Sequence, residues 1–298
     1  MAKPKLALIP ATQGSKLYSV LPADGVGDFT FSRNSAATRI NKDGLIETVA
    51  VGKSRLNYPL IDGVVNGCPS HLLEPERLQK IQYSEDFSNA YWTKSNTTLT
   101  SGFVSPDGTS NAFKLVENTS IGTHKNRVAA GLSAGVQYTL SVFAKKGERN
   151  WFWLNDVSNS KVYFDLENGV IGTVSNADDY SITEMKDGWY KCTMTSTMVG
   201  VGQFGIYLAD GDNSSSYTGD GTSGFYIYGA QLEQGSYPTS YIPNYGTSAG
   251  ITRSEEVAYG AGDASTFNDS EGVLMAEISA LADDGTDRVL GVSDGSAN

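Results

Sequence analysis

Short runs of alternating apolar and polar residues recur between residues 81 and 243, and turn-forming clusters separate them. The runs are AFKLVEN (112–118), YTLSVFAKK (138–146), NWFWLNDV (150–157), VYFDL (162–166), WYKCTMTST (189–197), QFGIYLAD (203–210) and GFYIYGAQLE (224–233). Clusters such as SPDGTS, KKGERN and LENGV lie between them, and helical periodicity is almost absent. Many short strands joined by turns predict an all-β fold, an antiparallel jelly-roll or β-sandwich over 81–243.

The sequence outside this pattern divides into three further parts. Residues 1–80 lack sustained periodicity and predict an extended N-terminal attachment arm that orders against a partner, with one hairpin of DFTFSR (28–33) and LIETVAV (45–51). Pro238 and Pro243 end the sandwich, because proline removes ladder donors. Residues 244–271 then form a linker. GVLMAEISAL (272–281) predicts the first strand of a second β-domain, 272–298, which we expect to be incomplete within the chain.

The charge of the chain argues against two classes of partner. Its net charge of −11 disfavours nucleic acid and an anionic membrane, because binding phosphates requires a basic surface. No apolar stretch reaches the roughly 18 residues of a transmembrane helix, and the apolar run LALI near the N-terminus is too short for a signal peptide. The two cysteines, Cys68 and Cys192, lie far apart in the sequence and are expected to be free thiols.

Several spacings imitate catalytic or metal-binding motifs without their context. GVGQFG (200–205) leads into a strand, whereas the dinucleotide fingerprint opens a helix. VGKS (51–54) lacks the first glycine of a phosphate loop, and GVSDG (291–295) has no histidine after its serine. Cys68 and His71 have no second pair of zinc ligands. We therefore expect that the protein is not an enzyme.

Four residues are candidates for sugar binding. Trp151 and Trp153 alternate with Phe152 and Leu154, and one of these two sets must face the core. If Phe152 and Leu154 point inward and the two runs pair as a hairpin, the exposed patch consists of Trp151, Trp153, Tyr163 and Asp165. An aromatic platform beside a carboxylate suits a neutral or amino sugar. The alternative is that both tryptophans are core residues; Trp92 and Trp189 are expected to be packing residues in either case.

Three stretches together resemble the phage head spike fibre domain family. They are DFTFSRNSAATRINKDGLIETV, CPSHLLEPERLQKIQYSEDFSNAYWTKSN and SYTGDGTSGFYIYGAQLEQGSYPTSYIP, and the resemblance covers about residues 24–245. The family's LLLEP-x-RTNLL is HLLEPERLQKI here, without the asparagine. The strand beginning GVLMAEI is similar to the start of a concanavalin-like sandwich.

The resemblance implies a structural virion protein with a jelly roll like that of carbohydrate-binding modules. It would be a fibre or spike on a tailed phage, on the head rather than the tail, and would contribute to host attachment. It would be a homotrimer, made in the host cytoplasm, with capsid or tail proteins bound by the arm. The alternatives are a glycan-binding module of a receptor-binding protein and, third, a depolymerase spike. No cofactor is expected, although jelly rolls of this kind often hold a structural calcium, for which Glu85, Asp86 and Glu233 are the nearest ligands.

Overall fold

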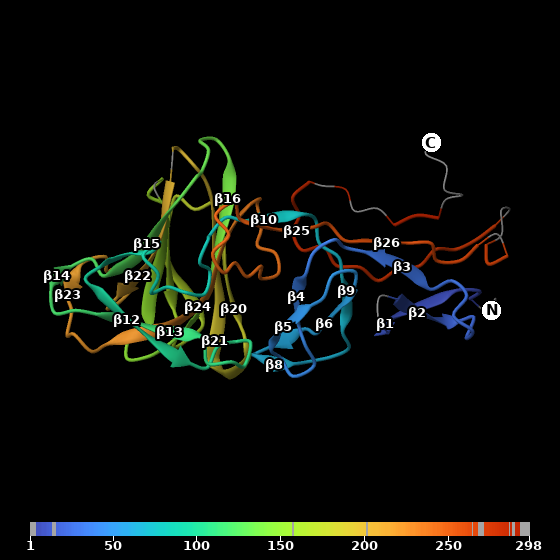
Figure 1. Cartoon of the computed structure of the whole chain (residues 1–298), viewed down its shortest axis with the longest axis horizontal. Helices are drawn as coiled ribbons and strands as arrows, with labels where there is room; N and C mark the ends of the chain where they lie inside the picture. Colours follow the sequence, from blue (N-terminus) through green and yellow to red (C-terminus); the bar gives the residue numbers. More distant parts are fainter. Residues whose placement is uncertain are drawn as a thin grey trace.

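The computed structural model describes residues 4–13, 16–156, 158–200, 202–263, 265–267, 271–285, 287 and 290–292 (Figure 1). The N-terminal strands are β1 (Ala7–Gln13), β2 (Lys16–Leu21), β3 (Phe29–Ser32), β4 (Ala37–Ile40), β5 (Ile46–Val49), β6 (Arg55–Asn57), β7 (Leu60–Ile61), β8 (Val64–Val65), β9 (Ser70–Leu72) and β10 (Arg77–Gln79). Those of the central part are β11 (Thr93–Ser95), β12 (Thr97–Phe103), β13 (Ala112–Glu117), β14 (Ile121–Gly122), β15 (Lys125–Ala130), β16 (Gln137–Lys145), β17 (Trp151–Asp156), β18 (Lys161–Asp165), β19 (Val170–Ser175), β20 (Asp179–Glu184), β21 (Trp189–Thr197), β22 (Gly202–Ala209), β23 (Tyr217–Thr218) and β24 (Gly224–Gln234). A short 3-10 turn, η1 (Lys186–Gly188), precedes β21, and β25 (Ile251–Arg253) and β26 (Val257–Tyr259) follow the central part.

Two antiparallel six-stranded sheets form the central β-sandwich. One has the order β11-β15-β22-β17-β18-β19 and is called the distal sheet below; the other, β12-β13-β24-β16-β21-β20, is called the proximal sheet. The strands match the alternating runs of the sequence, and the described residues contain no α-helix. The predicted all-β jelly-roll or β-sandwich fold is confirmed. None of the described helical segments is long and apolar enough to cross a membrane.

The core lies between the two sheets and is built from every second residue of their strands. Phe152 of β17 stacks on Phe164 of β18 and on Phe225 of β24, with ring centroids 5.1 and 4.9 Å apart. Trp92 and Cys192 are buried in the same cluster. Because alternate residues of a strand point to opposite faces, the side chains between these core positions lie on the outer faces of the sandwich.

The N-terminal 80 residues are a set of short hairpins rather than one extended arm. β4 and β5 form the hairpin around the turn at Asn41, whose Oδ1 accepts hydrogen bonds from the N–H groups of Asp43 and Leu45. The prediction that residues 28–33 form the first strand of this hairpin is wrong. Residues 29–32 instead form β3, which pairs with β2 and with β26.

The segment predicted as a linker completes this N-terminal part. β25 pairs with β10, and β26 adds to the sheet of β1, β2 and β3. Residues 251–259 of the same chain therefore supply strand partners for the arm, which was predicted to order against a partner. We keep the name arm for residues 1–80.

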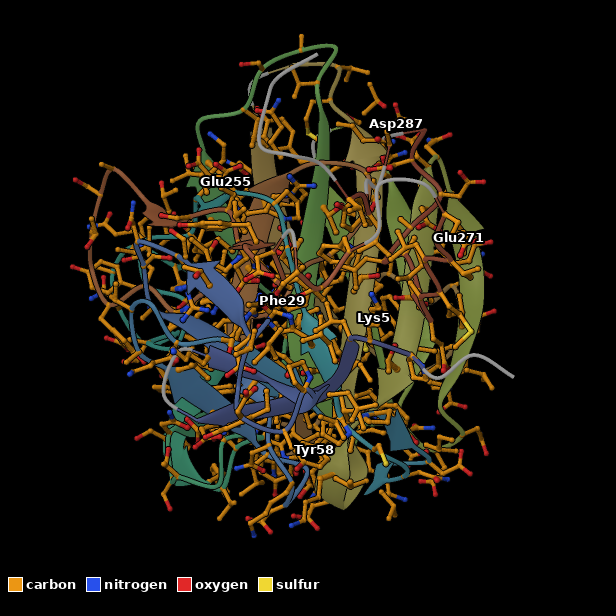
Figure 2. All side chains as sticks on the ribbon, turned by 90° about the vertical axis from the view of Figure 1, so that its right-hand side faces the viewer. Lys5, Phe29, Tyr58, Glu255, Glu271 and Asp287 are labelled. Carbon is orange, nitrogen blue, oxygen red and sulfur yellow. The ribbon has the colours of Figure 1, made fainter. Side chains whose placement is uncertain are left out.

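The arm covers the outer face of the proximal sheet. Ile46 of β5 shares a buried cluster with Phe143 of β16, Trp189 of β21 and Tyr228 of β24. Figure 2, seen from the arm side, has Phe29 and Tyr58 of the arm in front of the sandwich strands. Trp189 thus packs between the arm and the sandwich, as expected.

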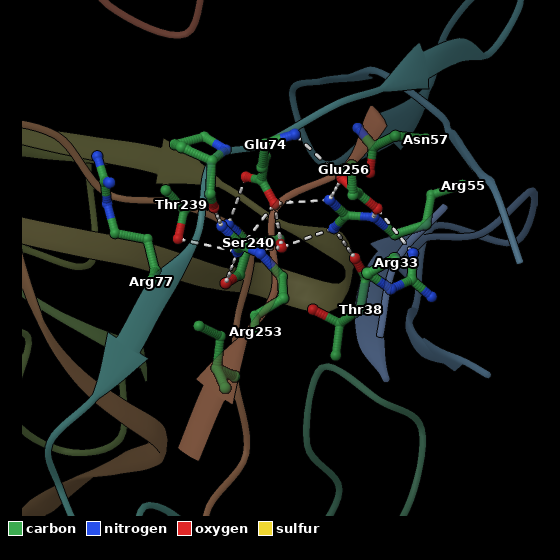
Figure 3. A network of polar contacts seen from close by, with 12 residues as sticks. Arg33, Thr38, Arg55, Asn57, Glu74, Arg77, Thr239, Ser240, Arg253 and Glu256 are labelled. Atoms are coloured by element: carbon green, nitrogen blue, oxygen red, sulfur yellow. Dashed lines mark hydrogen bonds and ion pairs between the residues drawn. The ribbon is translucent and has the colours of Figure 1, made fainter. Parts of the chain in front are cut away.

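A buried cluster of charges joins the arm to the segment that leaves the sandwich (Figure 3). Arg55 binds Glu74 and Glu256, and Arg33 Nη1 donates to Glu256 Oε1 over 2.7 Å. Arg253 Nη1 lies 3.0 Å from Glu74 Oε2. Moving the arm away would separate these buried ion pairs and leave uncompensated charges, so the contacts fix the arm in one position.

Gln79 anchors the last strand of the arm to the last strand of the sandwich. Its Nε2 donates to the carbonyl oxygens of Ala230 and Ile242, and its Oε1 accepts from the N–H groups of Ile81 and Leu232. The side chain is fully buried. An amide side chain with four internal hydrogen bonds therefore docks the arm at this point, in the stretch where the family's asparagine is missing.

Residues 271–285 have no strand assignment, and Val273, Met275 and Ile278 are exposed. The strand predicted at 272–281 is thus not formed here. Residues 286, 288, 289 and 293–298 lie outside the described residues, as does most of GVSDG, and the concanavalin-like second β-domain stays a prediction.

Candidate functional site

The four predicted sugar-binding residues lie together on the outer face of the distal sheet. β17 and β18 pair so that Trp151 stands opposite Asp165 and Trp153 opposite Tyr163. Phe152 and Leu154 face the core, as the sequence analysis required for this patch. The predicted hairpin and its facing are therefore correct.

A fifth residue, the aromatic Tyr207 of β22, completes the patch. It stands opposite Trp153, and their rings stack with centroids 4.0 Å apart; Trp153 also stacks with Tyr163 at 5.4 Å. We call Tyr207, Trp153 and Tyr163 the aromatic row. In QFGIYLAD, Tyr207 points to the face of the sheet opposite to that of Ile206 and Leu208. This alternation could have identified Tyr207 as a patch residue from the sequence.

The missing side chain of Gly205 leaves the space that the ring of Tyr207 occupies. A Cβ atom on Gly205 would lie 2.3 Å from Tyr207 Cε2, closer than any side chain allows. The tyrosine ring therefore covers the bare backbone of this glycine, and its hydroxyl donates to Asn155 Oδ1 over 3.3 Å. Burial raises the pKa of the Tyr207 hydroxyl, which keeps the hydroxyl protonated for this hydrogen bond.

The expected exposure of the patch is wrong for three of its four residues. Trp153, Tyr163 and Asp165 have exposed fractions of 4%, 1% and 4%, whereas Trp151 is half-buried. The rings of the aromatic row cover one another. Trp151 therefore provides the accessible aromatic surface among the predicted residues.

The segment after β22 contributes to this burial at the β19 side of the patch. Asp212 accepts hydrogen bonds from the N–H and hydroxyl groups of Thr173 on β19. A Cβ atom on Gly172 would lie 2.3 Å from Asp212 Oδ1 and 2.6 Å from Trp151 Cζ3. The glycine thus lets both side chains approach the backbone of β19. Trp151 lies at the edge of this contact.

The carboxylate of Asp165 stabilises the turn that follows β18. Its Oδ1 accepts from Asn150 Nδ2 and from the N–H of Glu167, and its Oδ2 accepts from Asn168 Nδ2. Because three donors already occupy the carboxylate, it is not free to bind the hydroxyl or amino groups of a sugar. The expectation that this carboxylate would bind a sugar beside an aromatic platform is therefore wrong.

Two buried polar atoms in the aromatic row, Trp153 Nε1 and the Tyr163 hydroxyl, lack a hydrogen-bond partner among the described residues. The indole Nε1 of Trp153 is buried and has no hydrogen-bond acceptor among the described residues. An unsatisfied buried donor is costly, by about 1–3 kcal/mol. The aromatic row therefore carries unsatisfied polar atoms beneath its stacked rings.

The three calcium candidates are not assembled into a metal site. Asp86 Oδ1 caps a turn by accepting from Ser88 and Asn89. Glu233 accepts from Gln231 Nε2 and from the N–H and hydroxyl groups of Thr239. The described part of the chain has no group of three or more His, Cys, Asp or Glu side chains that could hold a metal ion.

Glu85, the third calcium candidate, is surrounded by tyrosine hydroxyls. Its Oε1 accepts from Tyr228, Tyr241 and Tyr245 at 3.1, 3.1 and 3.2 Å, and its Oε2 accepts from Asn111. Burial raises the pKa of Glu85, while these hydroxyls oppose that shift. Donors satisfy this carboxylate without a cation.

A shallow groove of about 390 Å³ lies where the arm meets the proximal sheet. It is lined by residues 42–43, 62–65 and 184–187. Gly63 sits against the backbone of Met185, since a Cβ atom there would lie 2.5 Å from the carbonyl oxygen. This groove belongs to the junction between arm and sandwich and lies on the other sheet from the aromatic row.

No family model and no curated protein sequence matches the chain. Among solved structures, the chain is similar to the N-terminal CBM22-1–GH10 modules of endo-1,4-β-D-xylanase 10B from Clostridium thermocellum, complexed with xylohexaose. The match has 18% identity and a TM-score of 0.32, and covers 57% of this chain and 30% of that chain. The mannan-recognising carbohydrate-binding module TmCBM27 matches with 11% identity and a TM-score of 0.28, over 55% of this chain and 98% of that chain. The sheet topology itself carries the fold assignment.

Proposed function

We propose that this chain is a fibre or spike protein of a tailed-phage virion, and that its β-sandwich binds glycans of the host surface. The observation that carries the glycan-binding part is the accessible ring of Trp151, which packs beside the buried aromatic row on an outer sheet face. Aromatic side chains bind the apolar faces of sugar rings, and a platform on a rigid sheet is pre-organised for such contacts.

The position of the aromatic patch supports attachment through the arm and glycan binding through the sandwich. The arm packs on the proximal sheet, whereas the aromatic patch lies on the distal sheet. In Figure 1, β15 and β22 of the distal sheet lie on the side away from β4, β5 and β26. A fibre attached through its arm would thus present the aromatic patch outward.

Attachment through the arm is supported by its exposed apolar side chains. They are Val20, Leu21, Val26, Val51, Ile61 and Val64. Exposed apolar side chains such as these can be covered by contact with another protein. Together with the resemblance to head spike fibres, they support capsid or tail proteins as partners, the head as the favoured location, and a homotrimer joined at the arm.

The virion assignment is tested on purified particles. Mass spectrometry should detect this protein in stoichiometric copies, and light scattering of the whole protein should give the mass of a trimer. Particles without the protein would overturn the virion assignment, and a monomer would overturn the trimer.

Glycan binding is tested on an array of bacterial surface oligosaccharides. The wild-type protein should bind a defined subset with millimolar to micromolar affinity per site, and the exposed ring should contribute on the order of 1 kcal/mol of the binding free energy. Avidity in a trimer would raise the signal. Trp151→Ala should lose it, whereas Tyr180→Ala, which removes an exposed ring from the proximal sheet, should not. Equal binding by both variants and the wild type would contradict the proposed site.

A further inference from the structure

Three cationic side chains border the aromatic row. Lys125 of β15 stands opposite Tyr207 and extends the row by one strand. Arg127 stands opposite Gly205, which in turn stands opposite Asn155 of β17. Lys161 of β18 stands opposite Asn155 on its other side. Arg127 and Lys161 therefore lie at the two ends of a polar row that runs beside the aromatic row.

None of the three cations forms an ion pair with an acidic side chain among the described residues. Lys125 Nζ lies 5.5 Å from the ring centroid of Tyr207, and Lys161 Nζ lies 5.3 Å from that of Trp153. Burial lowers the pKa of Lys125, and the charge of Arg127 lowers it further. Three cations without acidic partners on one sheet face are unexpected in a chain with a net charge of −11.

The two acids at the Trp151 end of this face are engaged by other donors. Asp165 is occupied by Asn150, Asn168 and a backbone N–H. Asp212 is occupied by the backbone and hydroxyl of Thr173. The outer face of the distal sheet thus presents positive charge next to its aromatic side chains.

We propose that the saccharide bound on this face is anionic, with a carboxylate or phosphate group bound by Arg127 and Lys161. This inference rests on the proposed glycan binding and changes the expected ligand from a neutral or amino sugar. A guanidinium binds either anion through paired hydrogen bonds, and complementary charge gives selectivity.

The ligand must reach from the cations to the accessible ring. Trp151 and Asn155 are four residues apart on β17, and Asn155 shares its row with Arg127 and Lys161. A strand rises about 3.3 Å per residue, so Trp151 and the polar row lie roughly 13 Å apart. The ligand is therefore an oligosaccharide, with one sugar ring on Trp151 and its anionic group at the polar row.

Isothermal titration calorimetry on the whole protein tests this inference with matched probes. The first pair is an oligosaccharide containing glucuronic acid and the same compound with its carboxylates reduced to alcohols. The second pair is a phosphorylated oligosaccharide and its dephosphorylated counterpart. Arg127→Gln and Lys161→Gln are compared with Lys42→Gln, which removes the same charge from an exposed lysine of the arm that is paired with Asp43. A decathymidylate, which has backbone phosphodiesters but no pyranose ring and no carboxylate, serves as a general polyanion.

The wild-type protein should bind the anionic member of at least one pair about tenfold more tightly than the neutral member. Arg127→Gln and Lys161→Gln should remove this preference and keep the weaker binding that depends on Trp151, and Lys42→Gln should behave as wild type. Equal affinity for both members of each pair overturns the anionic ligand and leaves glycan binding intact. Binding to no saccharide overturns both. Equally tight binding of the decathymidylate overturns saccharide recognition in favour of a general polyanion surface.

Discussion

Trp153 of β17 stands between Tyr207 of β22 and Tyr163 of β18, and its ring stacks on Tyr207 with the centroids only 4.0 Å apart. This contact makes Trp153 a structural element of the site. Trp151, two residues earlier on the same face, keeps an accessible surface. The two tryptophans that look equivalent in the sequence therefore have different roles.

Substitution should separate these roles. Trp153→Ala should lower the free energy of unfolding by about 3–5 kcal/mol, because it opens a cavity between two buried tyrosines. Trp151→Ala should change it by less than about 1 kcal/mol while removing glycan binding. Urea unfolding of both variants, alongside the glycan array, checks this. Equal destabilisation by the two substitutions would mean that Trp151 is a core residue as well.

The buried charge cluster of the arm predicts a large effect from one isosteric change. Glu256 accepts hydrogen bonds from Arg33, from Arg55 and from the N–H of Glu74. Glu256→Gln should destabilise the protein by about 3–5 kcal/mol, because the buried guanidinium of Arg33 loses its counter-charge and that of Arg55 keeps only Glu74. Glu47→Gln, which removes the half-exposed pair with Arg39, should cost less than about 1 kcal/mol.

Chemical denaturation measures these two changes, and limited proteolysis locates them. In Glu256→Gln the first cleavage sites should lie in the arm or in residues 251–259, while the sandwich stays intact. Cleavage that begins within β16 or β24 would contradict the assignment of the cluster to arm docking.

His71 predicts a loss of arm stability in mild acid. Burial lowers its pKa from 6.5 to about 4, an effect that the charge of Arg55 strengthens and that of Glu256 opposes. Its ring packs against Phe31, and its Nε2 is buried without a hydrogen-bond partner among the described residues. Because the folded-state pKa lies below the unfolded one, the stability contributed by the neutral ring is complete above pH 6.5 and is lost as the pH falls toward about 4.

The free energy of unfolding should therefore decrease between pH 7.5 and pH 5 in the wild type and decrease less in His71→Gln. This window lies above the range in which the carboxylate of Glu74 is protonated, since Arg253 and Arg55 hold the pKa of Glu74 below its ordinary value despite burial. An identical pH dependence in both proteins would exclude His71 as the cause.

The sandwich and the facing of its strands could be predicted from sequence because they depend on local alternation. Phe152 and Leu154 are the natural core partners of Val162 and Phe164, and this choice alone placed Trp153 beside Tyr163. The burial of the aromatic patch could not be predicted in this way. It depends on Tyr207, more than 50 residues away in sequence, and on a turn segment without periodicity.

The arm was harder to predict for the same reason. Its order depends on contacts such as that between Arg33 and Glu256, which are 223 residues apart. Scattered arginines and glutamates in a stretch rich in proline give no periodic signal. A segment that looked like a linker thus proved to contain the strands β25 and β26.

The most direct test of glycan binding at the distal sheet is the set of indole N–H resonances of the four tryptophans. A titration with the best array glycan should shift the resonance of Trp151, with a smaller shift for Trp153. The resonances of Trp92 and Trp189, which are buried in the core and under the arm, should not move. Shifts at Trp189 or Trp92 with none at Trp151 would contradict the account.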